Sequence, residues 1–285
     1  MSRWAREMES LDPHVDCERI YFLLSSCEFS WDIEKALEFA LFRTYAVPTI
    51  SGLLSFTGEF RDRTRKRYDD TELLMSEVSE NGQESERGQA AIARINDMHG
   101  RFRISNDDTL YVLSTFVVEP VHWLERFGKR AMTPGEAEAC VHYYRALGSK
   151  MGIRDMPEDF AAFDGFHRAY EASNFRYAAT NAEIGSLTRD LLLSMHVPKI
   201  LVPLARPVVH ALCDKPLRSA MGFEDPPRWL EHLAVAGLKA RALVLRMVPS
   251  RRRPRLITER RRPTYPTGYR IMDLGTLGER TGSDG

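Results

Sequence analysis

The stretch AIARINDMHGRFRISNDDTLYVLSTFVVEPVHWLERFG (residues 91–128) contains two helix signals, and the second is the clearest in the chain. Apolar residues recur every three or four positions in its second half, which is the spacing of one helix face. They are Leu110, Leu113, Val117, Val121 and Leu124. Ser105 and Asp108 form the S-x-x-D pattern of a helix N-terminus, and Pro120 removes one backbone hydrogen bond. The pattern predicts a long amphipathic helix with a kink at the proline.

The first half of the stretch places a histidine on an apolar stripe. At helical spacing, Ile92, Ile95, His99 and Phe102 share one face. A buried imidazole without a hydrogen bond or a ligand loses its hydration with no compensation. Two interpretations stay open at this point: His99 is a core histidine bonded to a backbone carbonyl, or it is a metal ligand.

Composition favours a globular protein with no strong electrostatic preference. Of the 285 residues 43% are hydrophobic, and 40 basic residues balance 40 acidic ones, so we expect no nucleic-acid partner. The four cysteines form no C-x-x-C pair, which favours reduced thiols. The N-terminus lacks the apolar core of a signal peptide, and no run of about 18 apolar residues occurs. We therefore expect a cytoplasmic protein without a membrane span.

Helical periodicity recurs along the chain without alternating strands, so the sequence predicts an all-α fold. The clearest predicted helices cover residues 31–47, 71–80, 105–128, 133–152 and 226–248, and the His99 helix starts between Glu86 and Ala90. Ser30 is the expected N-cap of the first of these, Asp69 or Asp70 of the second and Thr133 of the fourth.

Three parts of the chain are predicted from these patterns. An N-terminal extension (1–19) precedes one globular helical domain (20–248), and a C-terminal extension (249–285) rich in proline and arginine is expected to be irregular and solvated.

Several kinds of catalytic site are excluded by missing motifs. The chain has no G-x-G-x-x-G or P-loop, no H-E-x-x-H zinc motif and no G-x-S-x-G elbow. The eight histidines never pair at i, i+4 on one helix, although a two-histidine iron or zinc site assembled from distant segments stays open. A single imidazole in an apolar helical pocket instead suits heme iron, which needs one proximal ligand and hydrophobic walls.

Several motifs of the chain resemble one oxygenase family, which contains the latex-clearing rubber oxygenases and the MpaB-type oxygenases of fungal mycophenolic acid biosynthesis. The matching segments are KRYDDT (66–71), INDMHGRFRISNDDTLYVLSTFVVEP (95–120), RFGKR (126–130), MGI with MP (151–157) and YPTGYRI. The resemblance covers roughly residues 20–270 and is closer to the MpaB branch.

This resemblance implies an all-α fold enclosing a heme b pocket, with His99 as the proximal iron ligand. The R-x-x-K-T motif of the rubber oxygenases, which lines the heme region, corresponds here to Arg67, Asp70 and Thr71. These three are the candidate catalytic residues, and Arg67 is also a candidate heme-binding residue. Asp70 replaces the lysine and reverses its charge, so the distal chemistry of the rubber oxygenases does not transfer unchanged. Glu59 is the candidate distal carboxylate.

Each candidate has an alternative. His122 and His142 are rival iron ligands on strongly predicted helices, while Arg67 and Thr71 are equally compatible with a surface arginine and a helix cap. Asn106 and Asp107 are expected to cap the helix that follows His99.

The resulting expectation is a heme b-dependent oxygenase. It would use dioxygen, on the heme face opposite His99, to oxidise or cleave a carbon–carbon double bond of a small hydrophobic, isoprenoid-like substrate. The sequence identifies no electron donor. The alternatives are a non-catalytic heme carrier or sensor and a helical interaction protein with a structural His99. Two clusters, Arg251, Arg252, Arg253 and Arg260, Arg261, Arg262, are compatible with peripheral membrane contact.

Overall fold

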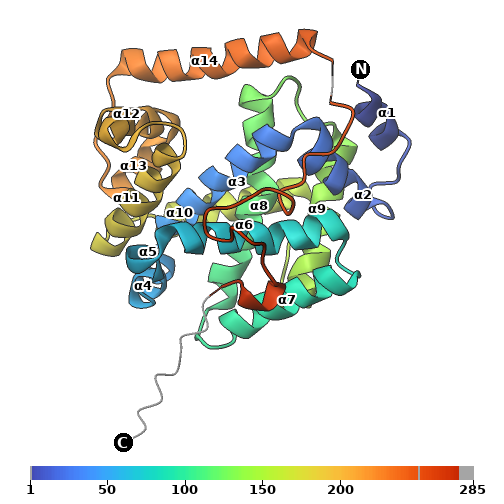
Figure 1. Ribbon diagram of the computed structural model, residues 1–285, viewed down its shortest axis with the longest axis horizontal. Helices are drawn as coiled ribbons and strands as arrows, with labels where there is room; N and C mark the ends of the chain where they lie inside the picture. The colour runs from blue at the N-terminus through green and yellow to red at the C-terminus, as the bar shows by residue number, and fades with distance from the viewer. Residues whose placement is uncertain (1, 250, 276–285) are drawn as a thin grey trace, which may run out of the picture.

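The computed structural model describes residues 2–249 and 251–275, and every regular element in this part of the chain is a helix (Figure 1). The prediction of an all-α fold is therefore confirmed. The first helices are α1 (Arg3–Glu9), α2 (Cys17–Phe22), the π-helix η1 (Leu23–Glu28), α3 (Ser30–Tyr45), α4 (Pro48–Phe56) and α5 (Glu59–Asp62). The middle of the chain forms α6 (Thr64–Asn81), α7 (Glu86–His99), α8 (Asn106–Phe127), α9 (Pro134–Lys150), α10 (Phe160–Asn174) and α11 (Ala179–Ser194). The last are the 3₁₀ helix η2 (Lys199–Leu201), α12 (Val202–Leu212), α13 (Lys215–Met221), α14 (Arg228–Met247) and the 3₁₀ helix η3 (Ile271–Asp273).

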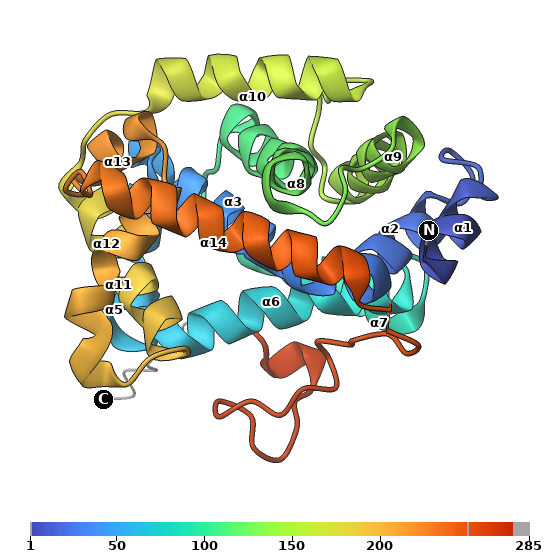
Figure 2. The same cartoon turned by 90° about the horizontal axis from the view of Figure 1, so that it is seen from above.

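Helix α8 is the central element. It packs along α3, and α9, α10 and α14 contact it from other directions (Figure 2). Its apolar stripe is buried at Leu110, Leu113, Val117 and Leu124. The Ser105 hydroxyl accepts a hydrogen bond from the Asp108 amide at 3.0 Å, which confirms the predicted cap. The helix continues through the buried Pro120.

Some predicted helix ends are wrong. Asp69 and Asp70 do not cap a helix, because α6 starts at Thr64 and both residues lie fully buried inside it. Ser30 is the first residue of α3 and not its N-cap. Helix α7 starts at Glu86, within the predicted window, but it ends at His99, so Phe102 lies beyond the helix.

Two buried clusters hold the helices together. The larger cluster contains residues of α2, η1, α3, α6, α7, α8 and α9, and it includes Trp4 and Met8 of α1. The smaller one connects α3 to α11 and α13 through Phe42, Ile184 and Met221. No helix within the described residues is long and apolar enough to cross a bilayer.

The described part of the C-terminal segment is irregular, as predicted, but a stretch of it contacts α6. It runs along α6, where Arg262 lies 2.7 Å from a carboxylate oxygen of Asp69 and Thr264 donates to the same carboxylate at 2.6 Å. The Glu80 carboxylate accepts from the amide of Ile257 at 2.6 Å. The expected solvated extension is therefore wrong for the part that contacts α6, including Arg262 and Thr264, because buried carboxylates on α6 pair with its arginine and hydroxyl groups, whereas residues 251–254 are exposed as expected.

Helix α9 starts with the predicted cap and approaches α8 closely at Gly148. Thr133 and Glu136 form a reciprocal capping box at its N-terminus. A Cβ atom at Gly148 would lie 2.8 Å from Leu113 Cδ2 of α8 and 2.5 Å from Met156 Sδ. The glycine allows the two helices to pack at this distance.

We expect Gly148→Ala to lower the free energy of unfolding by about 1–3 kcal/mol, because the added methyl group overpacks the α8–α9 contact. Gly165→Ala on the exposed side of α10 is the matched control, since nothing lies within 4 Å of its added Cβ. Alanine's better helix propensity should raise stability there by roughly 0.5–1 kcal/mol. Urea denaturation measures both; equal effects at the two sites would contradict the packing argument.

Candidate functional site

A cavity with a volume of about 930 Å³ lies among the central helices. All nine helices from α3 to α11 contribute to its wall. Members of both buried clusters border it, among them Tyr45, Phe60, Leu74, Ile95 and Leu113. A mostly apolar cavity with a few polar groups is the usual form of a small-molecule or cofactor site.

His99, the last residue of α7, borders this cavity. Ile92 and Ile95 of the same stripe are buried in the core, whereas His99 is solvent-accessible one turn further on. Neither ring nitrogen of His99 has a hydrogen-bond partner among the described residues. The interpretation as a core histidine bonded to a backbone carbonyl therefore finds no support in the geometry.

The His99 imidazole is held in its neutral form. Protein atoms surround the site closely enough that burial, with a smaller contribution from the Arg67 guanidinium, lowers the pKa of His99 to about 4. The ring is consequently uncharged at pH 7. A neutral imidazole has the free electron pair that metal coordination requires.

We expect the His99 ring of the apoprotein to titrate near pH 4, and NMR spectroscopy of the histidine ring protons, assigned with a His99→Gln variant, measures this. A histidine in an unfolded chain takes up its proton near pH 6.5. The unfolded state therefore binds the proton first, and the apoprotein should lose stability as the pH falls from about 6.5 to about 4. A midpoint near 6.5 would show that His99 is not desolvated.

Arg67, Asp70 and Thr71 line the same cavity from α6. The Arg67 guanidinium donates to the Thr71 hydroxyl, which in turn donates to the Arg67 carbonyl at 3.0 Å. The guanidinium also lies 5.5 Å from the ring centre of Phe60. The i, i+4 spacing on α6 thus fixes the Arg67 side chain through Thr71.

The Asp70 carboxylate is fully occupied by basic and hydroxyl partners. Lys66 lies 2.6 Å from one of its oxygens, and the Tyr265 hydroxyl donates to the other. Asp70 therefore does not place an unpaired negative charge beside the cavity. The charge reversal noted in the sequence is balanced by Lys66, one turn earlier on α6.

Three candidates lie away from the cavity wall. Glu59 on α5 pairs with Arg63 at 2.6 Å, and His122 on α8 lies 3.3 Å from Asp164. His142 on α9 packs against His14, with a ring-centre distance of 3.9 Å. None of the three borders the cavity in the described part of the chain.

The predicted caps next to His99 have another role. Ser105 caps α8, and Asn106 is its first residue. The Asn106 side chain accepts from the Arg154 amide at 2.9 Å and donates to the Arg154 carbonyl at 3.2 Å. Asn106 therefore anchors the loop after α9, whereas Asp107 borders the cavity.

Several polar residues of the cavity wall were not predicted. Arg103, Tyr45, Tyr68 and Tyr170 belong to this wall, and burial raises the pKa of Tyr45 to about 12. Tyr170 donates a hydrogen bond to Asp108 across the cavity wall. Of these four residues, only Arg103 has a sequence feature that points to the cavity, which is its position four residues after His99.

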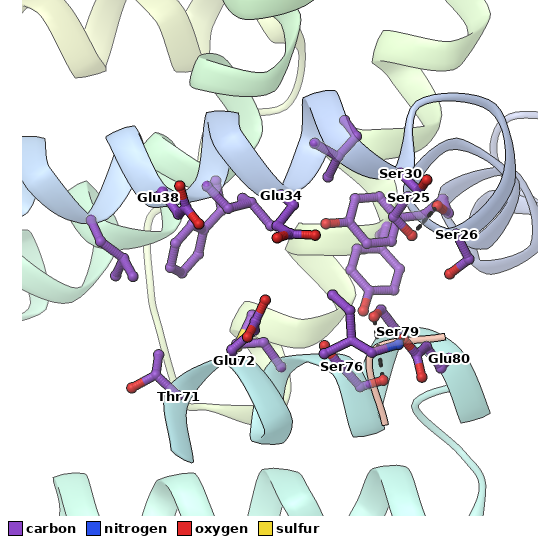
Figure 3. A pocket seen from close by; sticks show the side chains of 18 of the residues that line it. Ser25, Ser26, Ser30, Glu34, Glu38, Thr71, Glu72, Ser76, Ser79 and Glu80 are labelled. Carbon is purple, nitrogen blue, oxygen red and sulfur yellow. Dashed lines mark hydrogen bonds between the residues drawn. The ribbon is translucent and has the colours of Figure 1, made fainter. Parts of the chain in front are cut away.

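A second, smaller cavity of about 80 Å³ lies between α3 and α6 (Figure 3). Glu34 and Glu38 from α3 face Glu72 from α6 across it. Burial raises the pKa of Glu38 and of Glu72. Leu41, Tyr68, Thr71, Met75 and Phe116 border both cavities, so the two cavities lie next to each other and the glutamates belong to the smaller one.

Fold and site together define an all-α protein with a large apolar cavity that presents one neutral, unbonded histidine. Residues 41–246 match the family described as "ER-bound oxygenase mpaB/B'/Rubber oxygenase, catalytic domain". The chain belongs to this family, which confirms the resemblance seen in its motifs.

Three relatives carry the mpaB name. The chain is 33% identical over 225 residues to the ER-bound oxygenase mpaB' of Penicillium brevicompactum, covering 72% of this chain and 53% of the relative. It is 34% identical over 216 residues to the ER-bound oxygenase mpaB of Penicillium roqueforti (strain FM164), covering 70% and 72%. The ER-bound oxygenase mpaB of Penicillium brevicompactum is 37% identical over 136 residues, covering 46% and 35%. The chain thus spans about half the length of the first of these relatives.

Proposed function

We propose that this chain is a heme b-dependent oxygenase that uses dioxygen to oxidise or cleave a carbon–carbon double bond of a small hydrophobic, isoprenoid-like substrate. The observation that carries the proposal is His99, a neutral imidazole without a hydrogen-bond partner among the described residues, on the wall of an apolar cavity of about 930 Å³. The description of the family as oxygenases supports the reaction class.

The cavity residues fit heme b. His99 would hold the iron through one ring nitrogen, and the apolar wall would enclose the macrocycle. Arg67, oriented by Thr71, would pair with a heme propionate, because a guanidinium matches a carboxylate in charge and shape. When bound, heme supplies the redox and dioxygen chemistry that amino-acid side chains lack.

The remaining residues position these groups and exclude water. Asp70 accepts a hydrogen bond from Tyr265, which attaches the C-terminal segment to α6, while Lys66 neutralises its charge from within the same helix. Apolar side chains such as Phe60, Met75 and Phe116 form the surface against which a hydrophobic substrate would pack. Removal of water from such a surface favours binding by about 25 cal/mol for each Å² of apolar area buried.

We expect Arg67→Gln to weaken heme affinity by roughly 10- to 100-fold, which corresponds to the ~1.5–3 kcal/mol of a hydrogen bond to a charged group. Absorbance titration of the apoprotein with hemin measures this affinity. Arg61→Gln on α5 is the matched control, because Arg61 pairs with Glu183 and does not border the cavity. Equal affinities for the Arg67→Gln variant and the parent chain would remove Arg67 from the site.

Oxygen incorporation tests the proposed activity. The heme-loaded chain is incubated with farnesol as probe, ascorbate as reductant and isotopically labelled dioxygen, and the products are examined by mass spectrometry. The proposal predicts labelled oxygen in the product and none in the His99→Ala variant. A heme-loaded chain that consumes neither farnesol nor a longer isoprenoid would be a carrier or a sensor. A chain that does not take up heme would support the interaction-protein alternative.

A further inference from the structure

Helix α14 lies across the outside of the molecule and has only one buried residue, Ala242 (Figure 2). Its inner side is fixed by Arg241, which lies 2.8 Å from a carboxylate oxygen of Asp32 and 3.7 Å from the ring centre of Trp31. Val235 and Leu238 pack against the larger buried cluster. These contacts determine which side of α14 faces outward.

The outward side of α14 is apolar along its whole length. Exposed residues recur at steps of three and four, which places them on one helix face. They are Trp229, Leu233, Ala236, Ala240, Leu243 and Met247. Trp229 is 65% exposed and Met247 78% exposed, so large side chains stand in solvent at both ends of this stripe. A continuous apolar stripe of this length on a surface is typical of a binding face.

The charges beside the stripe are all basic. At 100° per residue, Arg228, Lys239 and Arg246 lie along one flank of it, and all three are exposed. The single acidic residue of α14, Glu231, pairs with Arg218 at 3.1 Å on the inner side. The outward side therefore combines apolar and positively charged residues without a carboxylate.

Further exposed basic residues follow the helix in the chain, namely Arg251, Arg252 and Arg253. The Arg251 carbonyl accepts a hydrogen bond from the Trp4 indole at 2.8 Å, which attaches this cluster to α1. In the second arginine cluster, Arg260 forms an ion pair with Glu34, and Arg262 forms one with Asp69. The first cluster, by contrast, has no ion pair within the described part of the chain, so its charges are available to a partner.

The combination of apolar and basic residues on the outward side of α14 favours one of three possible binding partners. A second copy of the chain docked through the same face would bring two basic flanks together without a carboxylate to neutralise them. Nucleic acid would pair with the basic residues but leave the apolar stripe in water. An anionic lipid surface satisfies both, because headgroups pair with the basic flank while the apolar side chains enter the acyl boundary.

We propose that the outward face of α14, together with Arg251, Arg252 and Arg253, binds the surface of an anionic phospholipid bilayer with the helix parallel to the membrane plane. The proposal does not depend on heme or on oxygenase activity.

Flotation of the full chain with lipid vesicles tests the proposal. We expect binding to vesicles of phosphatidylcholine mixed with phosphatidylserine and at least about tenfold weaker binding to phosphatidylcholine alone. The Leu233→Ser/Leu243→Ser variant should bind at least about tenfold more weakly, because two apolar side chains no longer leave water. Lys239→Ala and Arg246→Ala should each weaken binding roughly fivefold. Phe56→Ser, at an exposed apolar position of α4, is the control and should bind like the parent chain.

Tryptophan fluorescence gives a second readout. Trp4 and Trp123 are buried and Trp31 lies under Arg241, so Trp229 is the most exposed of the four indoles. Anionic vesicles should shift the emission to shorter wavelength, and the shift should disappear in Trp229→Phe.

Absence of vesicle binding, or binding unchanged by the Leu233→Ser/Leu243→Ser variant, would overturn the proposal. Light scattering that shows a dimer in the parent chain and a monomer in this variant would overturn it as well, because it would assign the face to a second copy.

Discussion

Replacement of His99 by alanine should weaken heme binding at least roughly 100-fold. Loss of a residue that merely supports a metal ligand costs about 10- to 100-fold in affinity, and His99 is the proposed ligand itself. Titration of the apoprotein with hemin, followed by absorbance, measures the dissociation constant. Addition of free imidazole should restore binding, because the deleted side chain leaves space on the cavity wall.

His122→Ala is the matched control for this prediction. His122 pairs with Asp164 on the outer side of α8 and does not border the cavity, so its removal should leave heme affinity unchanged. Circular dichroism shows whether both variants keep their helices. If His99→Ala bound heme like the parent chain while His122→Ala did not, the iron ligand would be His122 and the proposed site would be wrong.

The second large effect is on stability. Asp69→Ala should lower the free energy of unfolding by about 3–5 kcal/mol, because it leaves the buried Arg262 guanidinium without one of its carboxylate partners. It also removes the acceptor for Thr264 and so loosens the C-terminal segment from α6. Urea denaturation monitored by circular dichroism measures the change.

Arg65→Ala tests the same carboxylate from its exposed side. Arg65 lies 2.9 Å from Asp69, but its side chain is 36% exposed, so its loss should cost at most about 1 kcal/mol. Although burial raises the pKa of Asp69, hydrogen bonds from Arg65, Thr264 and Arg262 lower it overall. The stabilisation by this ion pair should therefore be lost as the pH falls through and below the usual aspartate range, near 4.

A loss below 1 kcal/mol for Asp69→Ala would contradict the structural role of the C-terminal segment.

The sequence predicted those parts of the fold that depend on local signals. The apolar stripe of α8 and its Ser105 cap are encoded within a few residues, as is the Thr133 cap of α9, and all are present. Asp69 and Asp70 have the same local appearance as caps, but their partners Arg262, Thr264 and Tyr265 follow almost 200 residues later. No local pattern distinguishes a capping aspartate from one that binds a distant arginine.

The residues of the candidate site also fall into two groups, those that a sequence motif marks and those that it does not. His99, Arg67 and Thr71 could be selected because a family motif marks them, and the structure brings them to one cavity wall. Tyr45 and Tyr170 border the same cavity from α3 and α10, where their sequence context resembles that of ordinary core aromatics. Packing of nine helices, α3 to α11, around one space creates this wall, and sequence spacing within single helices does not encode it.

The central claim is that the cavity beside His99 holds heme b. Its most direct test is the heme content of the chain, purified after expression with a heme precursor supplied, determined from the absorption spectrum of the pyridine complex of its heme. We predict about one heme b per chain and its loss in the His99→Ala variant. A colourless parent chain that also binds no hemin added after purification would contradict the claim, and with it the proposed oxygenase chemistry.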